Sequence, residues 1–108
     1  MSDHISPTEL AARLASATPP HLLDVREPDE HAFVALPGAK LVPLGQLFER
    51  AGEIAHWKDE VVVVYCHHGI RSRHGIAQLQ RLGFTQLQNL SGGIDAWSAE
   101  VDATLPRY

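Results

Sequence analysis

The hydrophobic positions of this chain fall into short runs, which are separated by polar or helically patterned segments. The strongest run, residues 61–65 (Val-Val-Val-Val-Tyr), is apolar on both faces, as is typical of a central strand in a parallel sheet. Weaker runs at residues 21–25, 40–42 and 87–90 predict further strands. The most buried strand is therefore expected in the second half of the chain.

Apolar residues at helical spacing occupy the segments between these runs. Ser6, Pro7 and Glu9 indicate the start of a helix with a capping box, and the Thr-Pro-Pro sequence at residues 18–20 stops it. Further helices are predicted over residues 28–34, over 44–54 from the spacing of Leu44, Leu47, Phe48 and Ile54, over 71–82 with Gly83 as the C-terminal cap, and over 94–101.

Strands and helices alternate along the chain, which predicts an α/β sandwich with a mostly parallel central sheet flanked by helices. A length of 108 residues fits one domain, placed here at residues 1–108, that buries a hydrophobic core without metal or disulfide staples. Ligand sites in such folds lie at the carboxyl ends of the strands. The residues that directly follow the strands are therefore the first candidates for function.

Composition narrows the classes of function. A formal net charge of −4 argues against a general nucleic-acid binder, which needs a basic surface. The apolar runs are too short to span a bilayer and the N-terminus lacks a signal-peptide pattern, so we expect a cytoplasmic protein without membrane contact. The single cysteine excludes an internal disulfide and a resolving thiol in the same chain. The sequence has no obvious exposed apolar stripe, so we expect a monomer.

That cysteine, Cys66, directly follows the run at residues 61–65 and begins the sequence Cys-His-His-Gly-Ile-Arg-Ser. A loop that enters a helix directs several backbone amides at one point, and the helix dipole adds about half a positive charge there. Gly69 allows the tight turn of such an anion-binding nest, and Arg71 adds a permanent charge with forked donors. These surroundings lower the pKa of a thiol, which makes Cys66 a candidate nucleophile.

Two other interpretations of Cys66 were considered. A lone cysteine is often a buried structural residue, but its position, the glycine and the arginine together favour catalysis. A metal site with His67 and His68 is disfavoured, because adjacent residues do not easily share one tetrahedral ion and no zinc-type spacing is present. We therefore expect neither a metal nor a cofactor. The two histidines are interpreted as residues that shape the loop and its charge, and His31 and the other histidines outside the loop as surface residues.

Beyond this loop, the chain resembles the rhodanese family of sulfurtransferases along nearly its whole length. The resemblance rests on the order and spacing of residues 22–30 (Leu-Leu-Asp-Val-Arg-Glu-Pro-Asp-Glu), 36–39 (Leu-Pro-Gly-Ala), 63–66 with the loop, 82–84 (Leu-Gly-Phe), 90–94 (Leu-Ser-Gly-Gly-Ile) and Trp97. It implies a rhodanese-like three-layer sandwich whose active loop cradles a cysteine persulfide. By this resemblance Cys66 takes sulfane sulfur from thiosulfate or a persulfide donor, with a protein as a possible donor. It then passes the sulfur to a thiophilic acceptor such as cyanide, a thiol or a protein partner.

The chain departs from the family pattern before the Pro-Gly-Ala turn. Rhodanese-like domains commonly carry Gly-His-Ile there, whereas residues 34–36 of this chain are Val-Ala-Leu. The change lies outside the active loop and bears on substrate access more than on catalysis. Residues 102–108 look like the end of rhodanese domains fused to enzymes that activate ubiquitin-like sulfur-carrier proteins. We interpret this tail as packing on the domain, with a partner role as the alternative.

The resemblance assigns roles to individual residues. Cys66 is the nucleophile and sulfur carrier, and the backbone amides of the loop stabilise its thiolate and persulfide. Arg71 attracts the anionic donor. The substrate-binding set is His67, His68, Gly69, Ile70, Arg71 and Ser72. Two alternatives stay open for each supporting residue: Asp24 and Arg26 either brace the loop or form a surface ion pair, and Arg73 either assists anion attraction or is solvated.

The same sequence features are compatible with two rival functions. Phosphatases and arsenate reductases of related folds place a cysteine and an arginine around an oxyanion. Their pattern needs five residues between the two, whereas four separate Cys66 from Arg71. A non-catalytic binding module, or a relay that carries sulfur only between proteins, has the same fold as the enzyme. The presence of the cysteine, the glycine and the arginine favours an enzyme.

Overall fold

The computed structural model describes residues 3–108 and contains a five-stranded sheet in which all pairings are parallel. The strands are β1 (His4–Ile5), β2 (His21–Asp24), β3 (Lys40–Leu41), β4 (Val61–Tyr65) and β5 (Gln86–Leu90), in the order β1-β5-β4-β2-β3. In the central strand β4, Val64 lies opposite Leu23 of β2 on one side and Asn89 of β5 on the other. The parallel sheet predicted from the sequence is confirmed.

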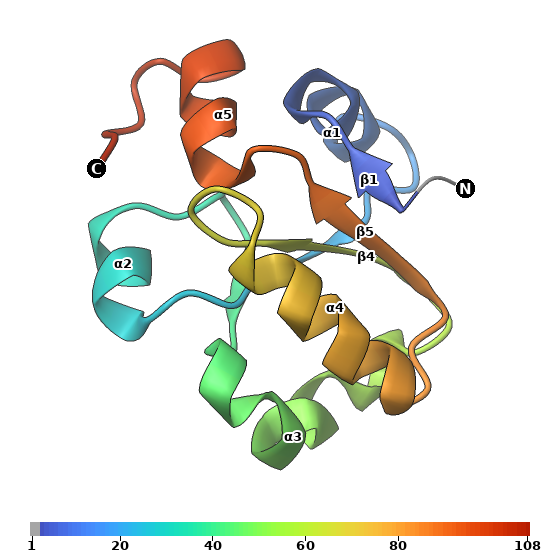
Figure 1. Ribbon diagram of the computed structural model, residues 1–108. Helices are drawn as coiled ribbons and strands as arrows, with labels where there is room; N and C mark the ends of the chain where they lie inside the picture. The colour runs from blue at the N-terminus through green and yellow to red at the C-terminus, as the bar shows by residue number, and fades with distance from the viewer. Residues whose placement is uncertain (1–2) are drawn as a thin grey trace.

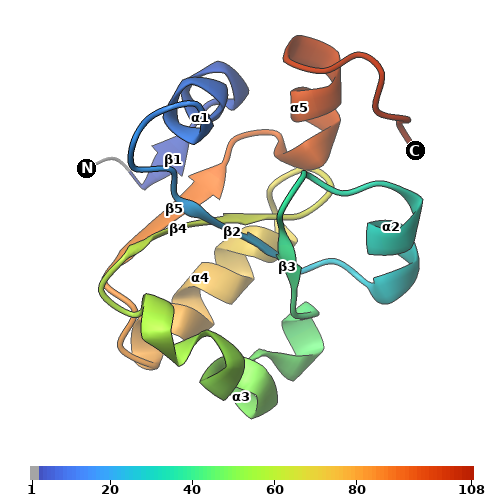
Figure 2. The same cartoon turned by 180° about the vertical axis from the view of Figure 1, so that it is seen from behind.

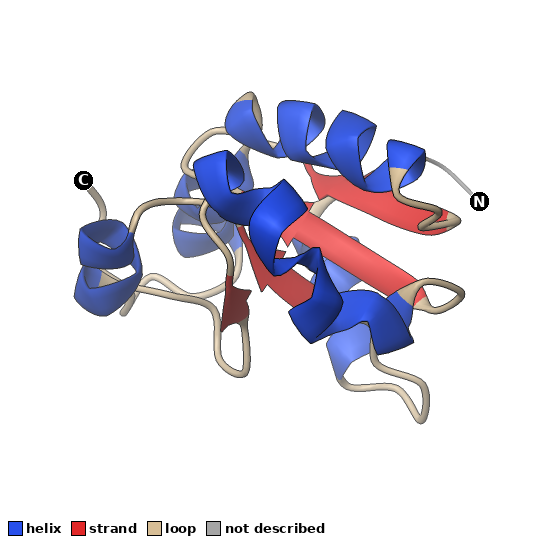
Figure 3. Ribbon diagram, turned by 90° about the horizontal axis from the view of Figure 1, so that it is seen from below, coloured by secondary structure: helices blue, strands red, loops and turns tan. Residues whose placement is uncertain are grey.

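Helices cover both faces of the sheet. They are α1 (Pro7–Leu14), α2 (Pro28–Phe33), α3 (Leu47–Arg50), α4 (Arg71–Arg81) and α5 (Gly93–Glu100), with 3-10 helices η1 (Leu44–Gln46) and η2 (Ala51–Trp57) on either side of α3. Figures 1 and 2 show α1 and α5 on one face and α3 and α4 on the other, and Figure 3 shows helices packed over the strands. No helix within residues 3–108 combines the length and apolar character needed to cross a membrane. The three-layer α/β sandwich is thus confirmed.

The alternation of side chains along β4 divides the core into two clusters. Val62 and Val64 belong to the cluster beneath α3 and α4, together with Leu79. Val63 and Tyr65 belong to the opposite cluster, which α1 and α5 cover. These four β4 side chains are fully buried, and only Val61, the first residue of β4, is partly exposed. Burial of both faces explains why the sequence of this strand is uninterruptedly apolar.

Local signals explain where the helices begin and end. The amide of Glu9 donates to Ser6 Oγ at 3.1 Å and the amide of Ser6 donates to Glu9 Oε1 at 3.2 Å, which completes the predicted capping box. Helix α1 ends at Leu14, before the Thr-Pro-Pro stop signal. Gly83 follows α4 with φ of +95°, a conformation that favours glycine at the C-terminal cap.

The segment at residues 44–54 corrects the expectation of one regular helix. It forms η1, α3 and part of η2 in succession, and Phe48 is 57% exposed instead of facing the core. Two glycines explain the break, because Gly45 and Gly52 each cost about 1 kcal/mol relative to alanine in a helix interior. Strand β1 was missed because a two-residue strand leaves no periodicity in the sequence.

Candidate active site

Cys66 is the first residue after β4 and lies at the carboxyl edge of the sheet, with only 1% of its surface exposed. The loop at residues 67–70, drawn in yellow in Figure 1, connects Cys66 to the start of α4. The amide of Gly69 donates to Cys66 Sγ at 3.1 Å, and the hydroxyl oxygen of Ser72 lies 3.4 Å from the same sulfur. Gly69 adopts φ of +104°, which favours glycine at this turn. The sulfur therefore lies among hydrogen-bond donors at the start of a helix.

Two opposing influences act on the pKa of the Cys66 thiol. Burial is the largest and raises the pKa, because a thiolate is poorly solvated inside the protein. The Ser72 hydroxyl, when it turns its proton from Asn89 to the thiolate, and backbone amides of the loop act in the opposite direction and outweigh burial. The pKa of Cys66 is thus lower than its ordinary value, and the site stabilises negative charge on sulfur.

Asn89 holds the loop from the neighbouring strand β5. Its Oδ1 accepts a hydrogen bond from the Ser72 hydroxyl at 2.5 Å, and its Nδ2 donates to the carbonyl of Gly69 at 3.0 Å. One buried amide side chain therefore holds Gly69 and Ser72, two of the residues that contact the Cys66 sulfur. The sequence analysis missed Asn89, although its place near the carboxyl end of a strand is a usable signal.

Helix α5 approaches the loop so closely that only glycine fits at its first position. A Cβ atom on Gly93 would lie 2.5 Å from the carbonyl oxygen of Cys66 and 2.4 Å from that of His67. This approach allows the amide of Ile94 to donate to the Cys66 carbonyl at 2.9 Å and that of Asp95 to the His67 carbonyl at 3.1 Å. Figure 1 shows the loop against the start of α5. Backbone contacts with α5 therefore constrain the loop conformation.

Arg71, which was predicted to attract an anionic donor, is paired with a carboxylate. Its Nη1 and Nη2 donate to the two oxygens of Glu30 at 2.7 and 2.9 Å, and the hydroxyl of Tyr108 donates to Glu30 Oε2 at 2.7 Å. The hydrogen bonds from Arg71, assisted by Tyr108, outweigh burial and lower the pKa of Glu30 to about 2. The sequence analysis assigned no role to Glu30, which precedes Arg71 by 41 positions.

Asp24 and Arg26 are both fully buried, so the interpretation as a surface ion pair is wrong. The Nε and Nη2 of Arg26 donate to the two carboxylate oxygens of Asp24 at 2.9 and 2.7 Å. The hydroxyl of Tyr65 donates to Asp24 Oδ2 at 3.2 Å, and His31 Nδ1 lies 2.8 Å from that oxygen. His31 was expected to be a simple surface residue, but α2 brings its partly exposed imidazole back to this carboxylate.

The C-terminal residues fold back against the loop. The ring of Tyr108 stacks on the imidazole of His67, and Arg26 Nη1 donates to the Tyr108 hydroxyl at 2.8 Å. Arg107 pairs with Asp95 of α5 at 2.9 Å. The tail therefore packs on the domain, as we interpreted it from the sequence, and it places Tyr108 at the rim of the loop. Its direct contact with loop residues was not predicted.

The other proposed site residues differ in exposure. His68 and Ile70 are exposed, whereas His67 Nε2 is buried and has no hydrogen-bond partner in the part of the chain that is described. His68 acts on the Cys66 sulfur through its backbone amide. Arg73 is exposed on α4 and helps to line a shallow pocket of about 230 Å³ with His68 and Ile70. The structure therefore places Arg73 on the solvent-exposed side of α4, beside the loop.

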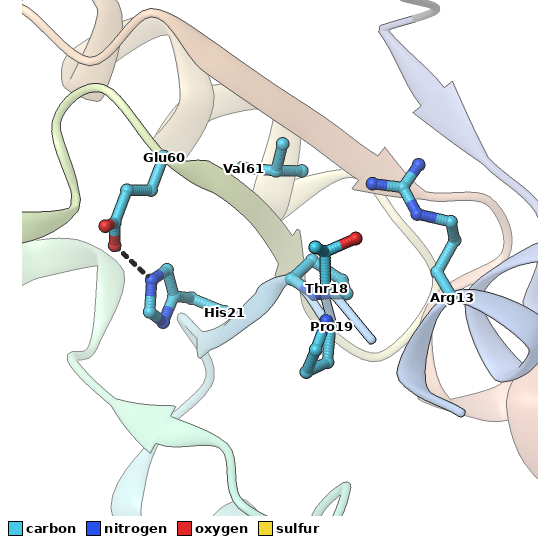
Figure 4. A pocket seen from close by; sticks show the side chains of 7 residues that line it. Arg13, Thr18, Pro19, His21, Glu60 and Val61 are labelled. Atoms are coloured by element: carbon cyan, nitrogen blue, oxygen red, sulfur yellow. Dashed lines mark hydrogen bonds and ion pairs between the residues drawn. The ribbon is translucent and has the colours of Figure 1, made fainter. Parts of the chain in front are cut away.

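A second pocket, of about 360 Å³, lies at the opposite edge of the sheet, beside the first residues of β2 and β4. Figure 4 shows Arg13 and the hydrogen-bonded pair His21 and Glu60 among its side chains. His21 also stacks on Trp57 with ring centroids 4.4 Å apart, so it is more than the simple surface residue expected from the sequence. The only cysteine of the chain lies at the other edge, so this pocket is separate from the candidate nucleophile.

The amino-acid sequence of this chain is similar to those of known sulfurtransferases. A family model described as a rhodanese-like domain matches residues 6–100. A sulfurtransferase from Allochromatium vinosum is 38% identical over 98 residues, which cover 91% of this chain and 90% of that protein. The probable adenylyltransferase/sulfurtransferase MoeZ from Mycobacterium tuberculosis is 34% identical over 104 residues, which cover 96% of this chain. The chain spans only 26% of the length of MoeZ.

Solved structures agree with these sequence relatives. The human single-domain sulfurtransferase TSTD1 superimposes with a TM-score of 0.80 at 26% identity, covering 93% of this chain and 98% of that one. A rhodanese-like domain protein from Staphylococcus aureus superimposes with a TM-score of 0.83 at 28% identity, covering 99% of both chains. The chain therefore belongs to the rhodanese-like domain family of sulfurtransferases.

Proposed function

We propose that this chain transfers sulfane sulfur, a divalent sulfur atom bonded to another sulfur, through a persulfide on Cys66. The observation that carries the proposal is the position of Cys66 Sγ among the Gly69 amide and the Ser72 hydroxyl, with the pKa of the thiol lowered. The thiolate is the nucleophilic form of cysteine, and the same donors stabilise the anion of a persulfide. Thiosulfate or a persulfide is the donor, and cyanide, a thiol or a protein is the acceptor.

The transfer balances in two steps. The Cys66 thiolate attacks the outer sulfur of thiosulfate, an S–S bond forms, and the S–S bond of the donor breaks with its electron pair leaving on sulfite. Cyanide then attacks the terminal sulfur of the persulfide, a C–S bond forms, and thiocyanate leaves as the Cys66 thiolate is restored. The negative charge lies on sulfur next to the loop amides both in the Cys66 thiolate and in the Cys66 persulfide. Hydrogen-bond donors at this position stabilise that charge.

A relay between proteins is the second candidate. It is favoured by the likeness to MoeZ, whose name joins an adenylyltransferase to a sulfurtransferase, over 96% of this chain. The tail at residues 102–108, which resembles the end of such fused domains, supports the same role. A relay uses the same Cys66 persulfide and differs only in taking sulfur from, or giving it to, a partner protein.

Intact-mass measurement tests the proposal directly. The wild type and Cys66→Ser are incubated with thiosulfate or with cysteine persulfide, and the product is then treated with cyanide. A mass gain of one sulfur atom on the wild type alone, removed by cyanide with release of thiocyanate, is the expected result. Failure of both donors to add sulfur to the wild type would overturn the proposal and favour a binding module.

A further inference from the structure

Three arginines around the Cys66 loop are each paired with a carboxylate. Arg71 binds Glu30 and Arg107 binds Asp95, each through two hydrogen bonds. Arg26 binds Asp24 in a fully buried pair. The formal charges cancel within each pair. Arg73 is exposed, so water and salt screen its charge. The described surface around the loop therefore lacks the concentrated positive charge that would attract a small dianion.

Glu30 is held in place as an ion. Its pKa of about 2 keeps it charged at neutral pH. Two donors of Arg71 and the hydroxyl of Tyr108 bind its carboxylate, and its side chain is only 16% exposed. Solvent therefore competes weakly for this carboxylate, and an incoming anion would have to displace it to reach both arms of Arg71.

Donors differ in how much they need that arginine. Thiosulfate is a dianion, so it brings two negative charges toward a site that already holds the Cys66 thiolate and the Glu30 carboxylate. A persulfide carries at most one negative charge on the sulfur that is transferred. Its leaving group is a thiolate, which takes the electron pair of the broken S–S bond and a proton from water. It therefore reaches the Cys66 thiolate without needing the guanidinium of Arg71.

We propose that Glu30, acting through Arg71, is a specificity-determining residue that favours persulfide donors over thiosulfate. The proposal rests on the sulfur transfer proposed above and names the donor class of the same site. The shared chemistry is R–S–SH, carried either by a small thiol or by a cysteine of a donor protein.

The test compares Glu30→Gln with the matched control Asp29→Asn. Asp29 lies on the same helix, is exposed and makes no bond to Arg71, so its substitution removes the same charge outside the pair. Loading of Cys66 is followed by intact mass with thiosulfate, cysteine persulfide or a persulfidated cysteine desulfurase. We expect Glu30→Gln to raise the second-order rate constant for thiosulfate about tenfold and to leave both persulfide rates within about twofold. Asp29→Asn is expected to change none of them.

Ionic strength separates the effect of charge from a packing defect. Thiosulfate loading of the wild type is not expected to fall with added potassium chloride, because Arg71 is already neutralised and salt also screens the repulsion between thiosulfate and the anionic site. In Glu30→Gln the same rate should fall steeply with salt, since salt screens the released guanidinium. A steep fall of the wild-type rate with salt would overturn the proposal, even where the variant fails to fold.

The outcomes separate this proposal from the proposed function. An unchanged ratio of thiosulfate to persulfide rates in Glu30→Gln would show that Glu30 does not select the donor, while sulfur transfer itself stands. No loading from any donor would overturn sulfur transfer and this proposal together. If Glu30→Gln shifts this ratio, the wild-type rates identify the source of the persulfide. Faster loading by the desulfurase than by cysteine persulfide indicates a protein donor, and the reverse indicates a small-thiol donor.

Discussion

The ring of Tyr108 lies flat against the imidazole of His67, with centroids 3.8 Å apart and planes inclined by 5°. Burial, followed by the neighbouring His68, lowers the pKa of His67, which favours a neutral ring in this stack. The contact joins the C-terminal tail to the loop that holds the nucleophile. The C-terminal tail therefore helps to hold the loop in its conformation.

Tyr108→Ala removes both this stack and the hydroxyl that bonds Arg26 and Glu30. We expect the free energy of unfolding to fall by about 2 kcal/mol, because an aromatic pair and a hydrogen bond to a charged group each contribute about 1 kcal/mol or more. Tyr108→Phe keeps the ring and should lose only about 1 kcal/mol. Urea unfolding measures both losses. Equal losses in the two variants would show that the stack adds no stability.

Ser72→Ala removes the hydroxyl that lies 3.4 Å from the Cys66 sulfur. The pKa of Cys66 should rise, because a hydroxyl that turns its proton to the thiolate stabilises the charged form. A pH titration of the ultraviolet absorbance of the thiolate measures the change. Ser91→Ala is the control, since Ser91 lines the neighbouring pocket but is not bonded to the sulfur. A pKa that stays unchanged in Ser72→Ala would contradict the role of the hydroxyl.

Gly93→Ala forces a methyl group into the carbonyl oxygens of Cys66 and His67 at a residue with φ of +64°. The loss of stability should be at least about 2 kcal/mol, and persulfide loading should fall as the loop moves. Gly52→Ala is the control, because open space surrounds that position, and it should gain about 0.5 kcal/mol. Thermal unfolding compares the two. Wild-type stability in Gly93→Ala would show that α5 does not constrain the loop.

Acid should destabilise the protein partly through Glu30. Its pKa of about 2 in the folded protein lies below the ordinary value of 4.5, because Arg71 and Tyr108 bind the carboxylate. The stability it contributes is therefore fully present above pH 4.5 and is lost as the pH falls toward 2. Urea unfolding across this window should show a smaller loss in Glu30→Gln than in the wild type.

Glu53 provides the comparison for that measurement. Its pKa is also lowered to about 2, by Arg50 and then Lys40, but its side chain is 39% exposed and solvent screens these contacts. Glu53→Gln should therefore change the acid dependence less than Glu30→Gln. An acid dependence that is the same in the wild type and in Glu30→Gln would mean that the Arg71–Glu30 pair does not stabilise the folded state.

The sequence predicts the fold and the position of the nucleophile because both depend on local patterns. The apolar run at 61–65 identifies the central strand, and the residue after a central parallel strand lies at the functional edge of the sheet. Gly69 and the helix that begins at Arg71 follow from the chemistry of the next residues. These parts need no knowledge of distant contacts.

The remaining features depend on pairs of residues that are far apart in the sequence. Glu30 meets Arg71 across 41 positions and Tyr108 across 78, and neither pair leaves a periodic or spacing signal. The sequence therefore shows that Arg71 is charged but does not show that Glu30 already occupies its guanidinium. Asn89 was missed for the same reason, because its partners lie on a different element.

The return of the tail to the loop also determines where the chain leaves the domain. A polypeptide joined after Tyr108 would start at the rim of the Cys66 loop, next to His67 and Glu30. A group tethered there by a short flexible linker reaches an effective concentration of about millimolar at the loop. An acceptor thiol attached at this point would meet a Cys66 persulfide without diffusing from solution, whereas a bulky tag would crowd the same entrance.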